Sequence, residues 1–96
     1  MSNKEKVLKI LSDNKEVLYS KYPIQSMAIF GSVSRNEQSE NSDVDVLVEF
    51  NDKIGIRFID LADEIENLLN QKVDLVSKNA VKPKYLRSIK KDLTYV

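Results

Sequence analysis

Two short apolar runs, separated by a polar stretch, constrain the fold of this chain more than any other feature of its sequence. The first run, residues 27–30, closes a segment over residues 24–30 and ends at Gly31-Ser32, and the second lies in a segment over residues 43–50. Apolar runs of this length between turn-forming residues are typical of β-strands. The sequence therefore predicts two strands, joined through a short helix over residues 32–37 and a polar connection over residues 38–42.

The second run carries two carboxylates, Asp43 and Asp45, at alternate positions among Val44, Val46 and Val48. Alternate side chains of a strand point to the same face, with Cα atoms roughly 6.6 Å apart, so the valines can fill a core face while the acids converge opposite it. Two like charges at this distance favour a bound cation. The chain has no Cys and no His, so a zinc site would lack its usual ligands. Carboxylates, phosphate oxygens and water instead suit Mg²⁺.

The first junction offers groups that suit a phosphate. Gly31 lets the backbone approach a ligand, and Ser32 at a helix start offers a hydroxyl and N–H groups. Arg35 follows Ser32 by three residues on the same helical face, where it can contact a terminal phosphate or pair with a neighbouring glutamate. An ordinary strand-to-helix turn would explain Gly31-Ser32 alone. Together with the carboxylates, however, the junction predicts a nucleoside triphosphate site.

A third carboxylate, Asp74, lies on another predicted strand over residues 71–77. If that strand lies beside the strand of Asp45, three carboxylates surround two metal positions about 3.5–4 Å apart. Such a site supports in-line attack of a hydroxyl on a nucleoside triphosphate, with Asp74 as the general base. A single acid in an apolar run can also serve only to protect an edge strand from aggregation.

The combined motif reads G-S-V-S-R-N-E-Q-S-E-N-S-D-V-D-V-L-V. In random sequences of this composition, a Gly-Ser pair at this fixed spacing before an Asp-x-Asp would occur in about one chain in a thousand. The motif resembles the signature of the minimal nucleotidyltransferases of the DNA polymerase β-like superfamily, and the likeness covers almost the whole chain. The resemblance implies that Asp43, Asp45 and Asp74 bind the metals and that Gly31-Ser32 holds the triphosphate. Asn36 departs from the pattern, because the family often has glycine there.

Proteins similar to this one act as antitoxins beside a helical HEPN-type ribonuclease toxin and adenylylate a tyrosine near its active site. The resemblance therefore implies Mg²⁺-dependent transfer of AMP from ATP to a hydroxyl of a partner protein. Two alternatives stay open: a non-catalytic module that neutralises its partner sterically, and nucleotide transfer to RNA or a small molecule. The expected absence of a second, substrate-gripping domain argues against transfer to RNA or a small molecule. Direct nucleic-acid binding is not expected either.

Three further helices complete the expected fold. One begins at Ser2 or Asn3 and reaches about Tyr19, one covers residues 56–70 with a strong apolar stripe, and one runs from Pro83 to about Lys91. Residues 93–96 can add a short edge strand. This order of elements predicts a two-layer α/β domain. The resemblance adds a small mixed sheet of the α+β type with helices mainly on one face, while the strand pairing stays open.

The 96 residues suit one domain, 1–96, with a modest core. Fifteen basic and fifteen acidic residues balance, but residues 36–70 hold ten acids against two bases and residues 78–96 hold six bases against one acid. The basic end suits a polyanion or an acidic partner, although a solvated helix face is the simpler interpretation. No run reaches membrane-spanning length and no apolar signal core is present, so the sequence predicts a cytoplasmic protein.

Overall fold

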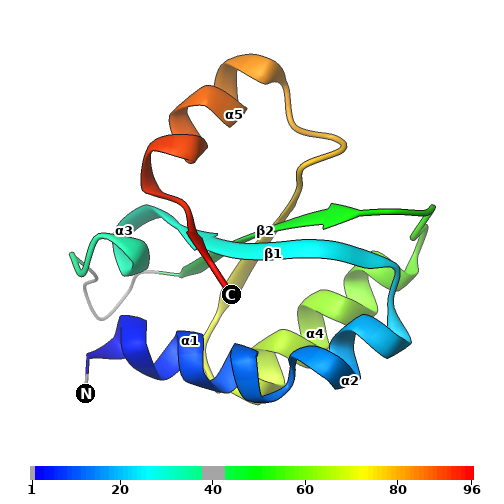
Figure 1. The fold of residues 1–96 in the computed structure, drawn as a ribbon, viewed down its shortest axis with the longest axis horizontal. Coiled ribbons are helices and arrows are strands. Elements are labelled where there is room, and N and C mark those ends of the chain that lie inside the picture. The colour runs from blue at the N-terminus through cyan, green and yellow to red at the C-terminus, as the bar shows by residue number, and fades with distance from the viewer. Residues whose placement is uncertain (1, 38–42) are drawn as a thin grey trace.

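The structure is a computed structural model that describes residues 2–37 and 43–96, so the polar connection predicted over residues 38–42 lies outside the described residues. Its strands form a four-stranded sheet in the order β3-β2-β1-β4, and Figure 1 shows how the helices surround it. In chain order the elements are α1 (Asn3–Asp13), α2 (Lys15–Lys21), β1 (Ile24–Phe30), α3 (Gly31–Ser34), β2 (Val44–Phe50), α4 (Arg57–Leu69), β3 (Val73–Ser77), α5 (Pro83–Ile89), the 3₁₀ helix η1 (Lys90–Asp92) and β4 (Thr94–Tyr95).

The sheet is mixed, as the family resemblance implied, and the structure shows the strand pairing that the sequence pattern left open. Strand β1 pairs antiparallel with β2 on one side and with β4 on the other. Strand β2 pairs parallel with β3. Because β2 and β3 are parallel, their N-terminal ends meet at the same edge of the sheet, which is where their aspartates lie.

One face of the sheet forms the hydrophobic core with α1, α2 and α4, which lie together below the sheet in Figure 1. The valines of β2 are fully buried on this face, as predicted. Helix α4 contributes the inner part of its apolar stripe, Leu61, Ile65 and Leu69. The α/β fold class with helices mainly on one face is therefore confirmed.

Helix α5 lies on the opposite side of the sheet, above it in Figure 1, and it has no buried residue. Its Tyr85 is more than half exposed, and Leu86 and Ile89 are only half-buried. The segment from β3 to β4 therefore extends over the face that carries the aspartates rather than joining the main core.

The prediction of one continuous N-terminal helix is wrong, because the helix is interrupted at Asn14. The backbone there has φ −104° and ψ 5°, and the Asn14 side-chain amide donates to the carbonyl of Ile10 at 2.8 Å. An asparagine side chain competes in this way with the helical backbone for its carbonyls. The predicted cap at Ser2 is confirmed, since its hydroxyl accepts from the N–H of Glu5 at 3.2 Å.

The other element boundaries differ from the predictions by a few residues at most. Helix α3 ends at Ser34, β2 begins at Val44, and α5 ends at Ile89, where the chain tightens into η1 before β4. In the described part of the chain, no helix is both long and apolar enough to cross a bilayer.

The buried stripe of α4 gives a direct test of the fold. Leu61 is fully buried, whereas Ile59 on the same helix is mostly exposed. We expect Leu61→Ala to lower the free energy of unfolding by about 3 kcal/mol, because it leaves a cavity in the core. The matched Ile59→Ala should lower it by less than about 0.5 kcal/mol. Urea unfolding followed by circular dichroism measures both, and losses of equal size would contradict the orientation of α4.

Candidate active site

The strand register brings the predicted carboxylates together. Asp45 of β2 lies directly opposite Asp74 of β3 in the parallel pair, so the two side chains share one face of the sheet. Asp43 lies two residues before Asp45, just outside the strand, and therefore points the same way. Asp43 and Asp74 are exposed, and Asp45 is half-buried. The edge of the sheet thus carries three carboxylates that contact solvent.

Asp45 has the most strongly perturbed environment of the three. Its burial first, and then the negative charges of Asp74 and Asp43, raise the pKa of Asp45 above its usual value, while the positive charge of Arg35 acts in the opposite direction. Both raising effects disfavour the charged carboxylate. A cation bound at this edge would offset them.

The residue types fit a hard divalent cation such as Mg²⁺, because carboxylate oxygens are its preferred protein ligands. Within residues 2–37 and 43–96, however, no three acidic side chains lie in positions from which they could already hold one ion. Carboxylates that face one another without a cation repel. The three carboxylates therefore suit a metal by their chemistry and by the strand register. To bind an ion, their side chains would have to move closer together.

Gly31 occupies a position that only glycine suits. Its φ is +71°, and a Cβ built on it would lie 2.2 Å from the Oδ2 atom of Asp45. No other residue allows both this backbone conformation and this approach. The sequence predicted that Gly31 lets the backbone approach a ligand, whereas the structure shows an approach to one of the carboxylates themselves.

The end of α3 explains the departure at Asn36. Asn36 has φ 59°, its N–H donates to Val33, and the N–H of Glu37 donates to the carbonyl of Ser32 at 2.8 Å. This pair of hydrogen bonds around a left-handed residue is a Schellman motif, which favours glycine and accepts asparagine. The turn is therefore formed in this chain, with Ser32 half-buried inside it.

Arg35 pairs with Glu37, which was one of its two predicted alternatives, and also with Asp92, which was not predicted. Its Nε donates to Oε2 of Glu37 at 3.0 Å, and its Nη1 donates to Oδ2 of Asp92 at 2.6 Å. These hydrogen bonds, Glu37 first, raise the pKa of Arg35 above its usual value, so the guanidinium stays charged. Its contact with a phosphate stays a prediction.

The C-terminal end of the chain reaches α3, which the sequence did not indicate. The hydroxyl of buried Ser34 donates to the backbone carbonyl of Asp92 and lies 2.8 Å from the hydroxyl of Thr94. These residues are 58 and 60 positions apart. Local sequence patterns do not indicate contacts between residues so distant in sequence, so Asp92 could not be predicted as a neighbour of α3.

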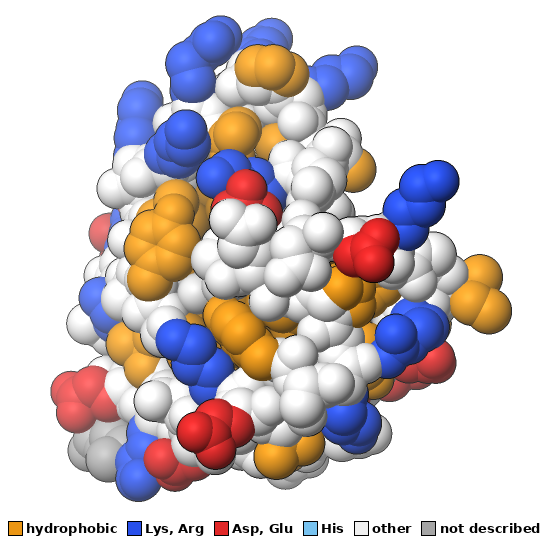
Figure 2. Space-filling view, turned by 45° about the vertical axis from the view of Figure 1, so that its right-hand side comes forward, with side chains coloured by type: hydrophobic (Ala, Val, Ile, Leu, Met, Phe, Trp, Pro, Cys, Tyr) orange, Lys and Arg blue, Asp and Glu red, His pale blue; other side chains and the backbone are white. Residues whose placement is uncertain are grey.

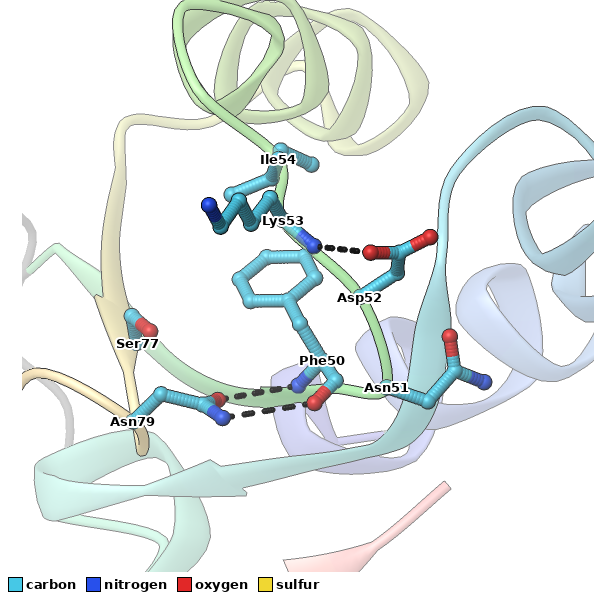
Figure 3. Close-up of a pocket in the computed structure, with 7 residues that line it drawn as sticks. All are labelled: Phe50, Asn51, Asp52, Lys53, Ile54, Ser77 and Asn79. Carbon is cyan, nitrogen blue, oxygen red and sulfur yellow. Dashed lines mark hydrogen bonds between the residues drawn. The ribbon is translucent and has the colours of Figure 1, made fainter.

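A cavity of about 460 Å³ lies at the other end of the same strands, where β2 and β3 end (Figure 3). The side chain of Asn79 accepts from the N–H of Phe50 at 3.0 Å and donates to its carbonyl at 3.3 Å, so it continues the strand pairing beyond β3. Five residues separate Asp45 from Phe50, which at ~3.3 Å per residue is about 16 Å. The carboxylates therefore lie away from this cavity. Its lining consists of Phe50, Asn51, Asp52, Lys53, Ile54, Ser77 and Asn79.

A mixed sheet that carries three carboxylates at one edge, beside a glycine turn and a short helix, defines a nucleotidyl-transfer type of protein. Comparison with known families agrees: the Nucleotidyltransferase domain family matches residues 5–96, and the chain belongs to that family. It is a nucleotidyltransferase, as the motif indicated.

Individual relatives are similar over nearly the full length. A Methanocaldococcus jannaschii chain, provisionally named a protein adenylyltransferase, is 49% identical over 91% of this chain and 91% of its own length. The protein adenylyltransferase MntA of Thermococcus cleftensis is 34% identical over 96% of this chain and 94% of its own. A crystal structure of a toxin–antitoxin with AMP-PNP has 28% identity and a TM-score of 0.71, covering 97% of this chain and 71% of that one.

The contact between Gly31 and Asp45 predicts that Gly31→Ala abolishes activity. The added Cβ must displace the Asp45 carboxylate, so we expect at least about a hundredfold loss of nucleotidyl transfer, since misplaced reacting groups cost that much. Gly55→Ala is the matched control, because Gly55 has a similar φ of +59° but nothing within 4 Å of its Cβ. Both variants carry similar backbone strain, so equal loss of activity in the two would contradict the role of the Asp45 contact.

The raised pKa of Asp45 predicts that Asp45→Asn stabilises the metal-free protein while it abolishes activity. A carboxyl whose pKa is raised on folding destabilises the folded state at neutral pH, and this cost disappears as the pH falls through that pKa. After solvent screening we expect a gain of ~0.5 kcal/mol, or about 2–4 °C in Tm. Thermal melts in EDTA measure it, with exposed Asp63→Asn as the control. An equal or lower Tm for Asp45→Asn would contradict the repulsion.

Proposed function

We propose that this chain transfers AMP from ATP to a hydroxyl, that of a tyrosine, on a HEPN-type partner protein and thereby acts as its antitoxin. The observation that carries the proposal is the parallel register of Asp45 with Asp74, with Asp43 beside them. Three carboxylates on one open sheet edge suit metal-assisted attack on a nucleoside triphosphate. The reaction uses ATP, so we place it in the cytoplasm.

The relatives support the choice of substrate and partner. The Thermococcus cleftensis chain is named a protein adenylyltransferase, which fixes both the nucleotide and the class of acceptor for that protein. The solved toxin–antitoxin contains AMP-PNP, an analogue of ATP. We propose the same nucleotide and the same class of acceptor for this chain, because its similarity to these two proteins extends over nearly all of its length.

In the proposed reaction, the oxygen of the acceptor hydroxyl bonds to the α-phosphorus of ATP. The bond from that phosphorus to the bridging oxygen of the β-phosphate breaks, and pyrophosphate leaves. Asp74, which is exposed, accepts the hydroxyl proton. Asp43, Asp45 and Asp74 would hold Mg²⁺, which would supply charge stabilisation for the phosphates when bound. The triphosphate is bound next to these carboxylates by Gly31, Ser32 and Arg35. The proposed site consists of these three residues and the three aspartates.

The open site suits a macromolecular acceptor. Asp43 and Asp74 are exposed, so an acceptor hydroxyl carried on a bulky protein can reach their carboxylates from solvent. Helix α5 borders the same side of the sheet and presents Tyr85 to solvent. Figure 2 shows Lys and Arg side chains gathered at the top of the molecule, where α5 lies in Figure 1. This surface offers a protein partner both charge and an aromatic contact.

The decisive experiment measures incorporation from α-labelled ATP in the presence of Mg²⁺. The chain is co-expressed with the product of the neighbouring gene, and the wild type is compared with Asp43→Ala/Asp45→Ala. We expect label on the partner from the wild type and a loss of at least about a hundredfold in the double variant, because the metal ligands are removed. The exposed acids of α4 provide the control Asp60→Ala/Asp63→Ala, which should keep its activity.

Each other outcome points to a different function. Undiminished label in Asp43→Ala/Asp45→Ala would contradict the proposed site. A stable complex without label from either protein would indicate steric neutralisation. Label on RNA or on a small molecule in the absence of any partner would assign the acceptor to another class.

A further inference from the structure

The C-terminal end of the chain is fixed to α3 at two consecutive residues. Ser34 and Arg35 both contact Asp92 in η1, the first through the Asp92 backbone carbonyl and the second through its carboxylate at 2.6 Å. Ser34 also shares a hydrogen bond with Thr94 of β4. These contacts join the helix that follows Gly31 to a segment nearly sixty residues further along the chain.

The hydrogen bonds of Ser34 are made by a buried side chain. Ser34 is the buried polar side chain among the described residues, and its hydroxyl finds its partners on the C-terminal segment. A buried hydroxyl without a partner is costly, so this hydrogen bond favours one position of α3 against η1. Asp92 is thereby held at a defined place beside Arg35.

The guanidinium of Arg35 is held at two of its three nitrogens. Glu37 accepts from Nε and Asp92 accepts from Nη1, and within the described residues Nη2 has no hydrogen-bond partner. Charge-assisted pairs of this kind give an arginine a defined orientation. The two carboxylates differ, however, because Glu37 belongs to the same turn as Arg35 and moves with it. Among the described residues, only Asp92 fixes the guanidinium relative to another part of the fold.

Arg35 follows the turn that Gly31 begins, so its guanidinium belongs to the same side of the site as Asp45. Its positive charge acts on the Asp45 carboxyl, which itself lies against Gly31 at the start of α3. A triphosphate bound at Gly31-Ser32 would therefore approach a cation whose place is already set. Orienting such a group before the ligand binds reduces the entropy lost on binding.

We propose that Asp92 is a positioning residue of the nucleotide site: its carboxylate holds Arg35 in the orientation that meets the triphosphate. The C-terminal segment, which carries no part of the recognised motif, thereby belongs to the active site. This inference rests on the proposed function, because it requires a nucleotide at Gly31-Ser32.

The test measures the Kd of Mg²⁺-AMP-PNP by isothermal titration calorimetry, together with the Tm of each variant. We expect Asp92→Asn to raise the Kd about fivefold, since a charge-assisted contact to phosphate is weakened, and to change the Tm by less than about 2 °C, because the pair is partly exposed. Asp92→Glu, which keeps the charge, should recover most of the affinity. Glu37→Gln is the matched control and should stay within about twofold of the wild type.

A double-mutant cycle separates positioning from a general structural effect. If Asp92 acts through Arg35, then Asp92→Asn should have no further effect on the Kd in the Arg35→Ala background. Additive effects, an unchanged Kd in Asp92→Asn, or tighter binding by that variant would each overturn the inference. A wild type that does not bind Mg²⁺-AMP-PNP would instead overturn the proposed function and this inference with it.

Discussion

The contact between Gly31 and Asp45 is the constraint on which the rest of the site depends. Strand β1 ends where Phe30 pairs with Asp45 of the antiparallel β2, and the chain turns immediately into α3. A side chain at residue 31 would occupy the place of the Asp45 carboxylate. The two halves of the motif, which are separated in sequence, are therefore adjacent because two antiparallel strands pair and one residue lacks a Cβ.

The two faces of the sheet have different roles. Fully buried valines of β2 pack on the helices and stabilise the fold, while Asp45 and Glu49 carry half-buried carboxylates on the other face, with the buried Leu47 between them. Bringing three like charges to one edge costs stability, and that cost is tolerated because the opposite face is well packed. The same arrangement leaves a site that a cation and a triphosphate can enter from solvent. Function and stability thus depend on the same strand through opposite faces.

The segment after β3 gives the small domain a second side to its proposed active site. Helix α5 adds little to the core, since none of its residues is buried. Its continuation through η1 and β4 nevertheless returns to α3 and to the edge of β1, through Asp92 and the pairing of Ile29 with Thr94. A chain of this size can thus fix α3 and Arg35 from its C-terminal end and still leave α5 exposed to solvent.

Much of this arrangement could be predicted from local sequence. The alternation of valine and aspartate in β2, the apolar stripe of α4 and the glycine at the strand end each follow from side-chain periodicity or backbone freedom over a few residues. These features, together with the motif, determined the fold class, the family and the candidate carboxylates. The break at Asn14 was missed because an asparagine within a helical pattern does not reveal which carbonyl it will compete for.

The tertiary structure alone decided how the pieces meet. Periodicity assigns a residue to a face but does not say which strands pair, so only the parallel register of β2 with β3 brought Asp74 to Asp45. The same is true of Asp92, whose contact with Arg35 joins residues 57 positions apart. Such contacts depend on the packing of the whole chain, because their free energy comes from burial and pairing that no local segment contains. The sequence by itself therefore determined which residues can do the chemistry, and the fold decided which of them stand together.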